Sequence, residues 1–313
     1  MFSPRFSPDA NHLRKVKVDW KVTMVVASLI INGIVNAFSS FFAITLNILT
    51  ILALRKTPSL PKPMKVLLLS LAVSDLGVGL LVQPFFIALI TMDMQQESSN
   101  FVLRIFHITG TFFSYASFFG ITALSLDRFL AIHLHLRYQE LVTHKRVAAL
   151  VIAIWVTSTI LALLVFFFQN ITFIVLAVIV VFCFLSTTFY YINIFLAVQR
   201  HKNQMRSTKA DAHQATADSE NGKEHFTRLR KSAVGTFYVY LVFLACYTPD
   251  FCIIVADVIN SGQRSTFVKH LAFFTLSLVF VNSSFNPLIY CWKMRNIRHA
   301  ITVIIRNIRQ CNK

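Results

Sequence analysis

The chain has 313 residues, of which 56% are hydrophobic and only 14% charged, a composition that excludes an ordinary pair of soluble domains and indicates one domain embedded in a membrane. Its formal net charge of +17 would suggest nucleic acid as the partner of a soluble protein. Here the basic residues lie in gaps between apolar segments and are not interleaved with aromatic residues, so we expect no nucleic-acid partner.

Seven apolar segments are long enough to cross a bilayer, which takes about 20 residues of helix. They predict an all-α membrane protein, with a seven-transmembrane helix bundle at residues 32–292. Residues 1–31 are expected to form an extracellular tail and an interfacial lead-in. Residues 1–20 hold no apolar run, so the first span is expected to act as its own insertion signal. The expected spans, in chain order, are 32–54, 66–91, 101–134, 147–168, 172–199, 226–257 and 268–292.

Three of these spans contain a proline, which removes a helix hydrogen bond and predicts a kink. The prolines are Pro84 in the second span, Pro249 in the sixth and Pro287 in the seventh. Between the fifth and sixth spans, residues 201–225 are polar and show no hydrophobic period. That segment, the third intracellular loop, is predicted to be mobile.

The basic residues predict the orientation of the bundle. Of the 30 Lys and Arg residues, 22 lie in the segments 55–65, 128–146, 200–231 and 293–313. Basic loops stay in the cytoplasm, so these segments are placed inside and the N-terminus outside. Five basic residues in the N-terminal tail favour the opposite orientation, but four segments outweigh one. We expect a multi-pass protein of the plasma membrane with a cytoplasmic C-terminus.

Residues 293–313 are predicted to form a short amphipathic eighth helix on the inner leaflet, followed by a cytoplasmic tail. Its isoleucines, Ile297, Ile301, Ile304 and Ile305, are expected to face lipid, while arginines face water and headgroups. Cys311 is a candidate palmitoylation site, although a lone tail cysteine is more often unmodified. None of the five cysteines lies in a segment placed outside, so no extracellular disulfide is expected. The sequon at Asn170 lies at the membrane edge and is expected to be unmodified.

The third span ends in an acid–base pair, Asp127-Arg128, which marks its exit from the membrane. One interpretation is a helix end that pairs with lipid headgroups. The neighbouring residues Phe129, Ala131-Ile132 and Leu136-Arg137-Tyr138 favour another. Together with the pair they resemble the end of the third helix and the second inner loop of class A, rhodopsin-like G-protein-coupled receptors. That family usually has Asp-Arg-Tyr and a later proline where this chain has Phe129 and His135.

Further motifs carry the same resemblance. Asn286-Pro287-Leu288-Ile289-Tyr290 is the most specific of them, and Cys246-Tyr247-Thr248-Pro249 is similar to the sixth-helix Cys-Trp-x-Pro, with Tyr247 in place of the toggle tryptophan. Tyr191 matches the partner tyrosine on the fifth helix. The resemblance implies that a ligand moves the sixth helix outward about Pro249, and that Arg128 is released from Asp127 to contact Tyr191 and a heterotrimeric G protein. Arrestin and a receptor kinase are further expected partners.

Asp75 and Asp250 are the two acids within apolar runs, and a buried ionisable group predicts a functional site. Around Asp75 the family's polar partners are matched by Asn47, Ser117, Asn282, Ser283 and Asn286. The resemblance implies an allosteric sodium site, since oxygen ligands suit a hard cation. A water-filled polar network that satisfies Asp75 is the alternative. We expect no other metal and no other cofactor.

The sequence restricts the chemical class of the ligand less closely than it does the receptor family. Gly110 stands where amine receptors carry their ligand-binding aspartate, and Phe280 stands where opsins carry the lysine that binds retinal. An amine receptor and an opsin are therefore both excluded. The missing fifth-helix proline, the short second outer loop and the missing cysteine pair resemble the melanocortin, lysophospholipid, cannabinoid and adenosine receptor cluster. A lipid-like, nucleoside or peptide ligand is therefore expected. Asp250 would either pair with a cationic ligand or be protonated and hydrogen-bonded. The expected pocket comprises Phe85, His107, Thr111, Tyr115, Tyr247, Asp250, Phe251 and Phe273.

Other classes are less well supported. A transporter or channel without G-protein coupling, the main alternative, would be expected to carry paired mid-membrane charges or internal repeats. An enzyme would require a catalytic or metal-binding cluster, and we identify no catalytic residue. Many relatives place an acid at the foot of the sixth helix that restrains the arginine. This chain has Leu229 there, which predicts a weaker restraint and some basal activity.

Overall fold

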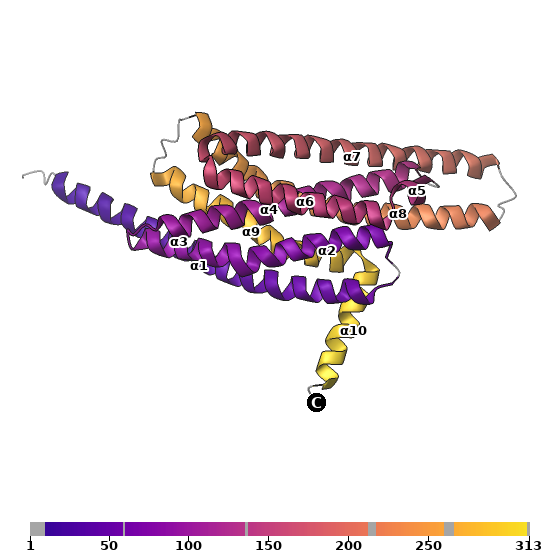
Figure 1. Cartoon of the computed structure of the whole chain (residues 1–313), viewed down its shortest axis with the longest axis horizontal. Coiled ribbons are helices and arrows are strands. Elements are labelled where there is room, and N and C mark those ends of the chain that lie inside the picture. Colours follow the sequence, from indigo (N-terminus) through magenta and orange to yellow (C-terminus); the bar gives the residue numbers. More distant parts are fainter. Residues whose placement is uncertain (1–9, 59, 135–136, 212–216, 260–265, 312–313) are drawn as a thin grey trace, which may run out of the picture.

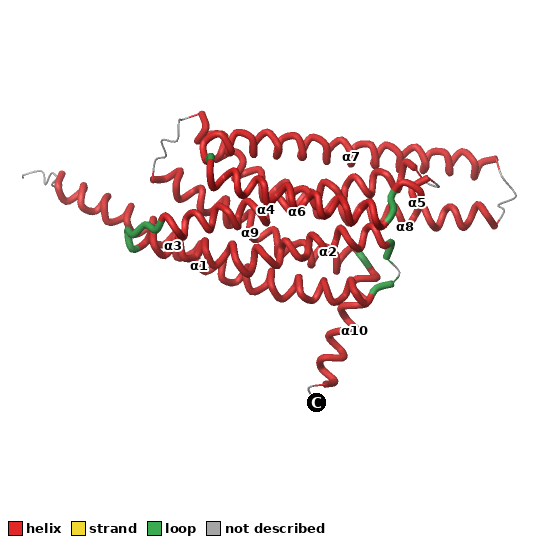
Figure 2. Tube along the Cα trace, viewed as in Figure 1, coloured by secondary structure: helices red, strands yellow, loops and turns green. Residues whose placement is uncertain are grey.

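The computed structural model describes residues 10–58, 60–134, 137–211, 217–259 and 266–311. Long helices run side by side along one axis and are joined by short connections (Figures 1 and 2). Within the described ranges, seven helical stretches are long and apolar enough to cross a membrane, which agrees with the expected fold class. The elements are α1 (Ala10–Lys56), α2 (Lys62–Gly77), the π-helix η1 (Val78–Val82), α3 (Gln83–Met94), α4 (Asn100–Leu134), α5 (Tyr138–Leu141), α6 (His144–Phe167), α7 (Gln169–Asp211), α8 (Ala217–Ile259), α9 (Thr266–Lys293) and α10 (Arg295–Cys311).

The second span consists of α2, η1 and α3, and its irregular turn has a local cause. Pro84 cannot donate a backbone hydrogen bond, and its ring would collide with the carbonyl of Leu80 in a regular helix. The wider π turn that ends at Val82 accommodates this proline. Gly79 lies in the same turn, against α1, where Ser40 Oγ donates to the Gly79 carbonyl at 2.8 Å. A side chain at Gly79 would come within 3.1 Å of Ala43, so glycine permits this close approach.

Two expected boundaries differ from the structure. Helix α1 begins at Ala10 rather than at Asn32, because no proline interrupts the chain between Ala10 and Lys56. The expected mobile loop at 201–225 is largely helical, since α7 continues to Asp211 and α8 starts at Ala217. Lys- and Ala-containing polar sequence propagates a helix once a long span has nucleated it.

The bundle is apolar on its outer surface and polar in places inside it, the arrangement that a bilayer favours. Phe38, Phe182 and Leu185 are 65%, 70% and 65% exposed, whereas Asn47 and Asp75 are fully buried. Lipid is as apolar as these outward side chains, so association of the helices depends on packing and on hydrogen bonds between them. Such bonds join Trp155 Nε1 to Ser70 Oγ, Thr188 Oγ1 to Tyr240 Oη, and Asn36 Nδ2 to Ser277 Oγ, at 3.0, 2.7 and 2.7 Å.

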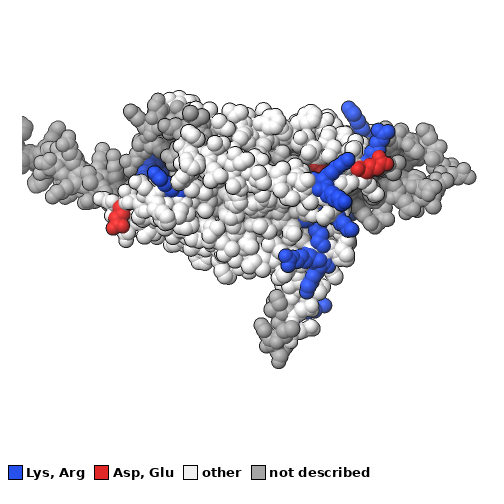
Figure 3. All heavy atoms as spheres, in the orientation of Figure 1, with Lys and Arg blue, Asp and Glu red and all other residues white. Residues whose placement is uncertain are grey.

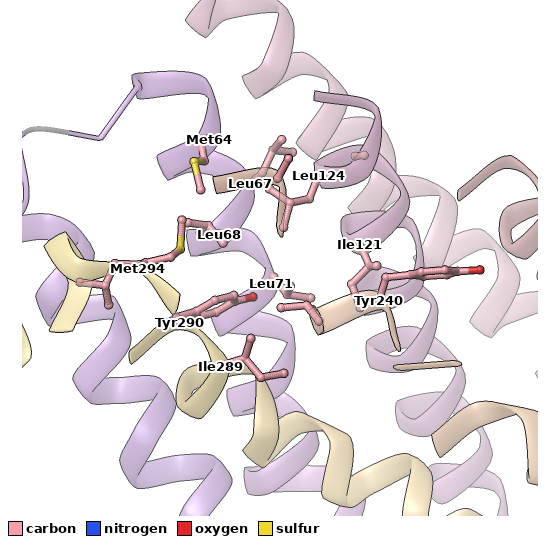
Figure 4. Packing of buried hydrophobic residues seen from close by; sticks show 14 of the residues in the cluster. Met64, Leu67, Leu68, Leu71, Ile121, Leu124, Tyr240, Ile289, Tyr290 and Met294 are labelled. Carbon is pink, nitrogen blue, oxygen red and sulfur yellow. The ribbon is translucent and has the colours of Figure 1, made fainter. Parts of the chain in front are cut away.

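Helix α4 occupies the centre and packs against α2, α6, α7 and α8. Apolar side chains from these helices and from α9 and α10 form one core cluster, part of which is drawn in Figure 4. Because α4 packs against helices of four other spans, the charged pair at its end is placed where several helices meet.

Helix α10 projects from one end of the bundle (Figure 1). Its isoleucines were expected to face lipid, and this is wrong for Ile297, Ile301 and Ile304, which are buried in the core cluster; Ile305 is 38% exposed. The apolar face of α10 is covered by α1 and α9, which a periodicity in the sequence cannot distinguish from lipid.

Basic side chains gather at the same end of the bundle as α10 (Figure 3). The described ones there include Arg55, Lys56, Lys62, Lys65, Arg137, Lys145, Arg146, Arg230, Lys231, Lys293, Arg295, Arg298 and Arg306. The opposite end carries the Lys269–Asp93 ion pair. The basic segments of the sequence therefore lie together on one face, which we call the basic end.

Candidate functional site

The Asp127–Arg128 pair lies at the basic end, in the last turns of α4. Arg128 Nε donates to Asp127 Oδ2 at 2.9 Å, and Arg128 Nη2 donates to the same oxygen. The other carboxylate oxygen, Oδ1, accepts a hydrogen bond of 2.7 Å from Tyr138 Oη. Asp127 and Arg128 are 4% and 2% exposed. This burial rules out pairing of the two charges with lipid headgroups, because the pair faces other helices.

Tyr138 belongs to α5, outside the membrane-spanning helices. Burial raises the pKa of its phenol well above the usual range, and the neighbouring Asp127 carboxylate raises this pKa further. The hydroxyl therefore keeps its proton at physiological pH and remains a donor to Asp127. A single carboxylate thus joins the end of α4 to the following loop.

A second helix also holds Arg128. Its Nη1 donates to Ser232 Oγ on α8 at 3.1 Å, at the position where α8 packs against α4. The sequence comparison pointed to Leu229 as the residue where relatives carry a restraining acid. Ser232, which lies almost one turn later on α8, was not predicted to bind Arg128. A search for any acceptor at i+3, rather than for an acid, would have found it. The restraint on the arginine is a neutral hydroxyl in place of a carboxylate.

The other predicted activation residues are placed around this pair. Phe129 packs against the ring of Tyr190, with 5.4 Å between centroids. Leu136 lies outside the described residues. Tyr191 is buried on α7, accepts a hydrogen bond of 3.1 Å from Ser125 Oγ and stacks on Tyr240 with 5.3 Å between centroids.

The Asn-Pro-x-x-Tyr motif lies on α9, with Pro287 inside the helix. Tyr290 is 2% exposed, and its hydroxyl has no hydrogen-bond partner among the described residues. In Figure 4 its ring lies beside Leu71 with the hydroxyl directed into the core cluster. A buried hydroxyl without a partner is costly.

The centre of the bundle holds Asp75. Its Oδ2 accepts from Asn286 Nδ2 at 2.8 Å, its Oδ1 accepts from Ser117 Oγ at 3.4 Å, and Ser283 is a further hydrogen-bonding neighbour. Ser117 also donates to Ser74 Oγ at 2.9 Å. Asn47 instead donates to backbone carbonyls of α1 and α9, including Ser283 O at 3.0 Å. Three of the predicted partners, Asn286, Ser117 and Ser283, thus contact the Asp75 carboxylate. A fourth, Asn47, donates to the backbone carbonyl of Ser283 instead.

The oxygens near Asp75 fit a cation. The amide oxygens Oδ1 of Asn47, Asn282 and Asn286 are buried and have no hydrogen-bond donor among the described residues. A carboxylate and buried oxygen acceptors suit a hard monovalent cation, and of these three asparagines Asn286 is hydrogen-bonded directly to Asp75. The side chains present therefore fit sodium, while buried water could satisfy the same oxygens.

A second polar network, missed in the sequence, joins α1, α3 and α9 further along the bundle. Ser277 Oγ donates to Asn32 Oδ1 at 2.7 Å, Asn36 Nδ2 donates to Ser277 Oγ at 2.7 Å, and Gln83 Nε2 donates to Asn36 Oδ1 at 3.4 Å. All four side chains are buried. Asn32, Asn36 and Ser39 recur at helical spacing on α1, a pattern that would have predicted this polar face.

A cavity of about 160 Å³ opens among α4, α7, α8 and α9. Six of the eight predicted ligand-binding residues line it: His107, Thr111, Tyr115, Tyr247, Asp250 and Phe251. Asp250 Oδ1 accepts a hydrogen bond from Thr275 Oγ1 at 3.1 Å. Tyr247 stacks on Phe243 with 4.0 Å between centroids, and the neighbouring Cys246 is buried with a free thiol. Pro249 lies inside α8 beside these residues.

Phe85 and Phe273 do not line this cavity. Both pack in the aromatic cluster around the fully buried Phe86, which borders the cavity; the ring of Phe86 lies 5.8 Å from that of Phe273. The π turn before Pro84 rotates α3 about its axis, a change that residue spacing alone does not reveal. Phe106 and Phe280 line the cavity instead.

The family profile described as "7 transmembrane receptor (rhodopsin family)" matches residues 46–174 and 168–290 of this chain. The chain belongs to the rhodopsin family of seven-transmembrane receptors. This membership confirms the predicted class A resemblance. The family is one of receptors rather than enzymes, and it does not support the transporter or channel alternative.

Individual relatives agree with this assignment. The chain is 26% identical to human melanocortin receptor 3 over 268 residues, which cover 83% of this chain and 80% of that receptor. It is 24% identical to sheep adenosine receptor A3 over 300 residues, covering 86% and 87%. The crystal structure of squid rhodopsin has the same fold, with a TM-score of 0.78, 17% identity and coverage of 92% and 88%.

Proposed function

We propose that this rhodopsin-family receptor binds an extracellular ligand in the cavity among α4, α7, α8 and α9, and activates a heterotrimeric G protein through the basic end. Its N-terminus would lie outside the plasma membrane and its C-terminus in the cytoplasm. The observation that carries the proposal is the double restraint on Arg128, by Asp127 on its own helix and by Ser232 on α8.

Helix α8 connects the two ends. Tyr247, Asp250 and Phe251 in the cavity and Ser232 at the basic end lie on the same helix, with 18 residues from Ser232 to Asp250, or about 27 Å of helix. Pro249 leaves the Ala245 carbonyl without its helical donor and so weakens α8 at the cavity. A ligand that binds better when α8 is displaced would shift the population toward that conformation. The displacement breaks the Arg128–Ser232 hydrogen bond and opens the basic end.

The polar site around Asp75 would regulate the same conformational change. A sodium ion held by Asp75 and the amide oxygens of Asn282 and Asn286 would supply a positive charge that joins α2 to α9. The same carboxylate is hydrogen-bonded to Asn286, the first residue of the Asn-Pro-x-x-Tyr motif. Rearrangement of α9 therefore disturbs this site and Tyr290 together.

The proposal is tested by measuring dissociation of Gα from Gβγ in cells that express the chain, against lipid, nucleoside and peptide fractions. A fraction that stimulates dissociation only in receptor-expressing cells is expected. Silence with every fraction and every Gα class, in cells with confirmed surface expression, would contradict the proposal.

Ser232→Ala is expected to raise ligand-free G-protein activation. A hydrogen bond to a charged group contributes about 1.5–3 kcal/mol, and its loss from the resting conformation would raise the active population about tenfold or more. Ser232→Glu replaces the hydroxyl with a carboxylate and is expected to lower the basal signal. Ligand-free nucleotide exchange at matched receptor density measures both.

Lys231→Ala is the matched control, because Lys231 is exposed on the same turn of α8. Equal basal signals in Ser232→Ala, Ser232→Glu and the unsubstituted receptor would show that Ser232 does not restrain Arg128. A ligand-free signal no higher than in cells without the receptor would remove the prediction of basal activity.

A further inference from the structure

A second hollow lies on the outer surface of the bundle between α7 and α8. It is lined by Ile174, Ala177, Val178, Val181, Phe182, Leu185, Phe251, Ile254, Val255 and Ile259, and its volume is about 440 Å³. All ten side chains are apolar. We call it the α7–α8 groove. It follows α7 for 12 residues, from Ile174 to Leu185, about 17 Å of helix, which is long enough to accommodate an extended alkyl chain.

The groove faces the bilayer rather than the interior. Val178, Phe182 and Ile259 are 64%, 70% and 75% exposed. Its α7 residues and most of its α8 residues belong to membrane-spanning stretches, Ile174–Arg200 and Leu229–Ala256. In a membrane, therefore, what lies against this surface is lipid hydrocarbon.

The groove and the interior cavity lie on opposite sides of a shared wall. Ala177, Phe251 and Ile254 line both, so only one layer of side chains separates the membrane from the space that contains Asp250. Ala177 contributes no more than a methyl group to this layer. A ligand whose tail lies in the groove would have to displace only this layer to place a polar group in the cavity.

An apolar groove in lipid does not by itself select a ligand, because hydrocarbon gains little on moving from one apolar environment to another. Selectivity for one ligand over bulk lipid must therefore come from the polar head of that ligand. Asp250 follows Pro249, precedes Phe251 of the shared layer, and is the one acid among the described residues that line the cavity, together with His107 and the hydroxyl-bearing Tyr115 and Tyr247. A carboxylate within a membrane span favours a cationic partner.

From this shared layer we infer that the receptor takes a membrane-borne, single-chain amphiphile with an ammonium head, which enters between α7 and α8. The head binds at Asp250 in the cavity, and the alkyl tail remains in the α7–α8 groove. This inference rests on the proposed function and names the ligand class of the same site. It also places the ligand against Pro249, where it bears directly on α8.

Photolabelling tests the inference without any signalling step. The full chain is purified into phosphatidylcholine nanodiscs and irradiated with hexadecylamine that carries a diazirine near the end of its tail; hexadecanoic acid with the same diazirine is the charge-reversed probe. Labelling of α7 residues 174–185 or α8 residues 251–259 is measured by mass spectrometry. We expect amine labelling that excess unlabelled hexadecylamine displaces, and at least fivefold less labelling by the acid.

Substitutions locate the two parts of the ligand. Val178→Trp fills the groove and is expected to lower displaceable labelling at least fivefold. Ala177→Leu narrows the shared layer and should act in the same direction. Val156→Trp is the matched control, because Val156 is 52% exposed on α6 and lies outside the groove. Asp250→Asn should lower amine labelling at least fivefold. Thermal unfolding in the same nanodiscs verifies that each variant is folded.

The outcomes separate the inference from the proposed function. Labelling that excess amine does not displace, or that is equal in Val178→Trp and Val156→Trp, represents bilayer contact alone and overturns the inference. The inference also fails if a water-soluble ligand fraction activates the G protein with full potency in Val178→Trp while no displaceable labelling occurs; the receptor function then stands. Displaceable, Asp250-dependent labelling without nucleotide exchange on any G protein supports the binding site and counts against the proposed function.

Discussion

Arg128→Ala is expected to reduce G-protein activation, with or without ligand, to the level of membranes that lack the receptor. The guanidinium is 2% exposed and binds both Asp127 and Ser232, so its release on displacement of α8 is the structural change that the G protein would detect. Without Arg128 no cation at this position can leave the pair and enter the opened cleft. The measurement is nucleotide exchange on purified G protein at matched receptor density.

The substitution also affects stability, and the design must separate the two effects. Removal of one partner from a buried ion pair costs about 3–5 kcal/mol, because the remaining charge is left without compensation. The double variant Arg128→Ala, Asp127→Asn removes both charges and keeps an acceptor for Tyr138. It is expected to recover surface expression but not signalling.

Arg137→Ala is the control, since Arg137 is an exposed arginine at the same basic end. It should leave nucleotide exchange within about fivefold, because exposed charges contribute at most about 1 kcal/mol. Stimulated exchange in the folded double variant at the unsubstituted level would contradict the role of Arg128.

Asp75→Asn is expected to abolish a stabilising response to sodium. The substitution removes the carboxylate charge and leaves the unpaired amide oxygens of Asn47, Asn282 and Asn286, so a cation has no counter-charge in the centre of the bundle. If sodium is present at ten times its Kd, it stabilises the receptor by about 1.4 kcal/mol, which the variant should lose entirely. The measurement is the thermal unfolding midpoint in sodium chloride against choline chloride at equal ionic strength.

Asp250→Asn provides the matched control, because Asp250 is an acid of another span, on α8, and lies in the cavity rather than in the polar centre. It should keep the full sodium response. An unsubstituted receptor with the same unfolding midpoint in both salts would favour the alternative of a water-filled network around Asp75.

The seven spans and the family were predictable from the sequence, because both depend on local features. The length of an apolar run suffices to predict a membrane helix. The residues Asp127-Arg128 and Asn286-Pro287-x-x-Tyr290 are contiguous motifs, so the family resemblance required no knowledge of how the helices pack. The basic loops were likewise read directly, and the structure gathers them at one end (Figure 3).

The ends of the helices were less predictable. Hydropathy marks where a helix leaves the membrane and not where it stops being helical. The start of α1 at Ala10 and the continuation of α7 to Asp211 therefore differ from the expected boundaries at Asn32 and His201. The physical reason is that polar residues extend an existing helix at little cost.

What the sequence by itself determined is which residues carry charge and hydrogen-bonding groups inside an apolar chain, and hence the receptor family. Only the tertiary structure decided which of these groups meet. Ser232 reaches Arg128, and Phe85 leaves the cavity, because helix rotation and the π turn at Val78–Val82 set the direction of each side chain. Contacts between helices far apart in the chain depend on those rotations, and a one-dimensional pattern does not contain them.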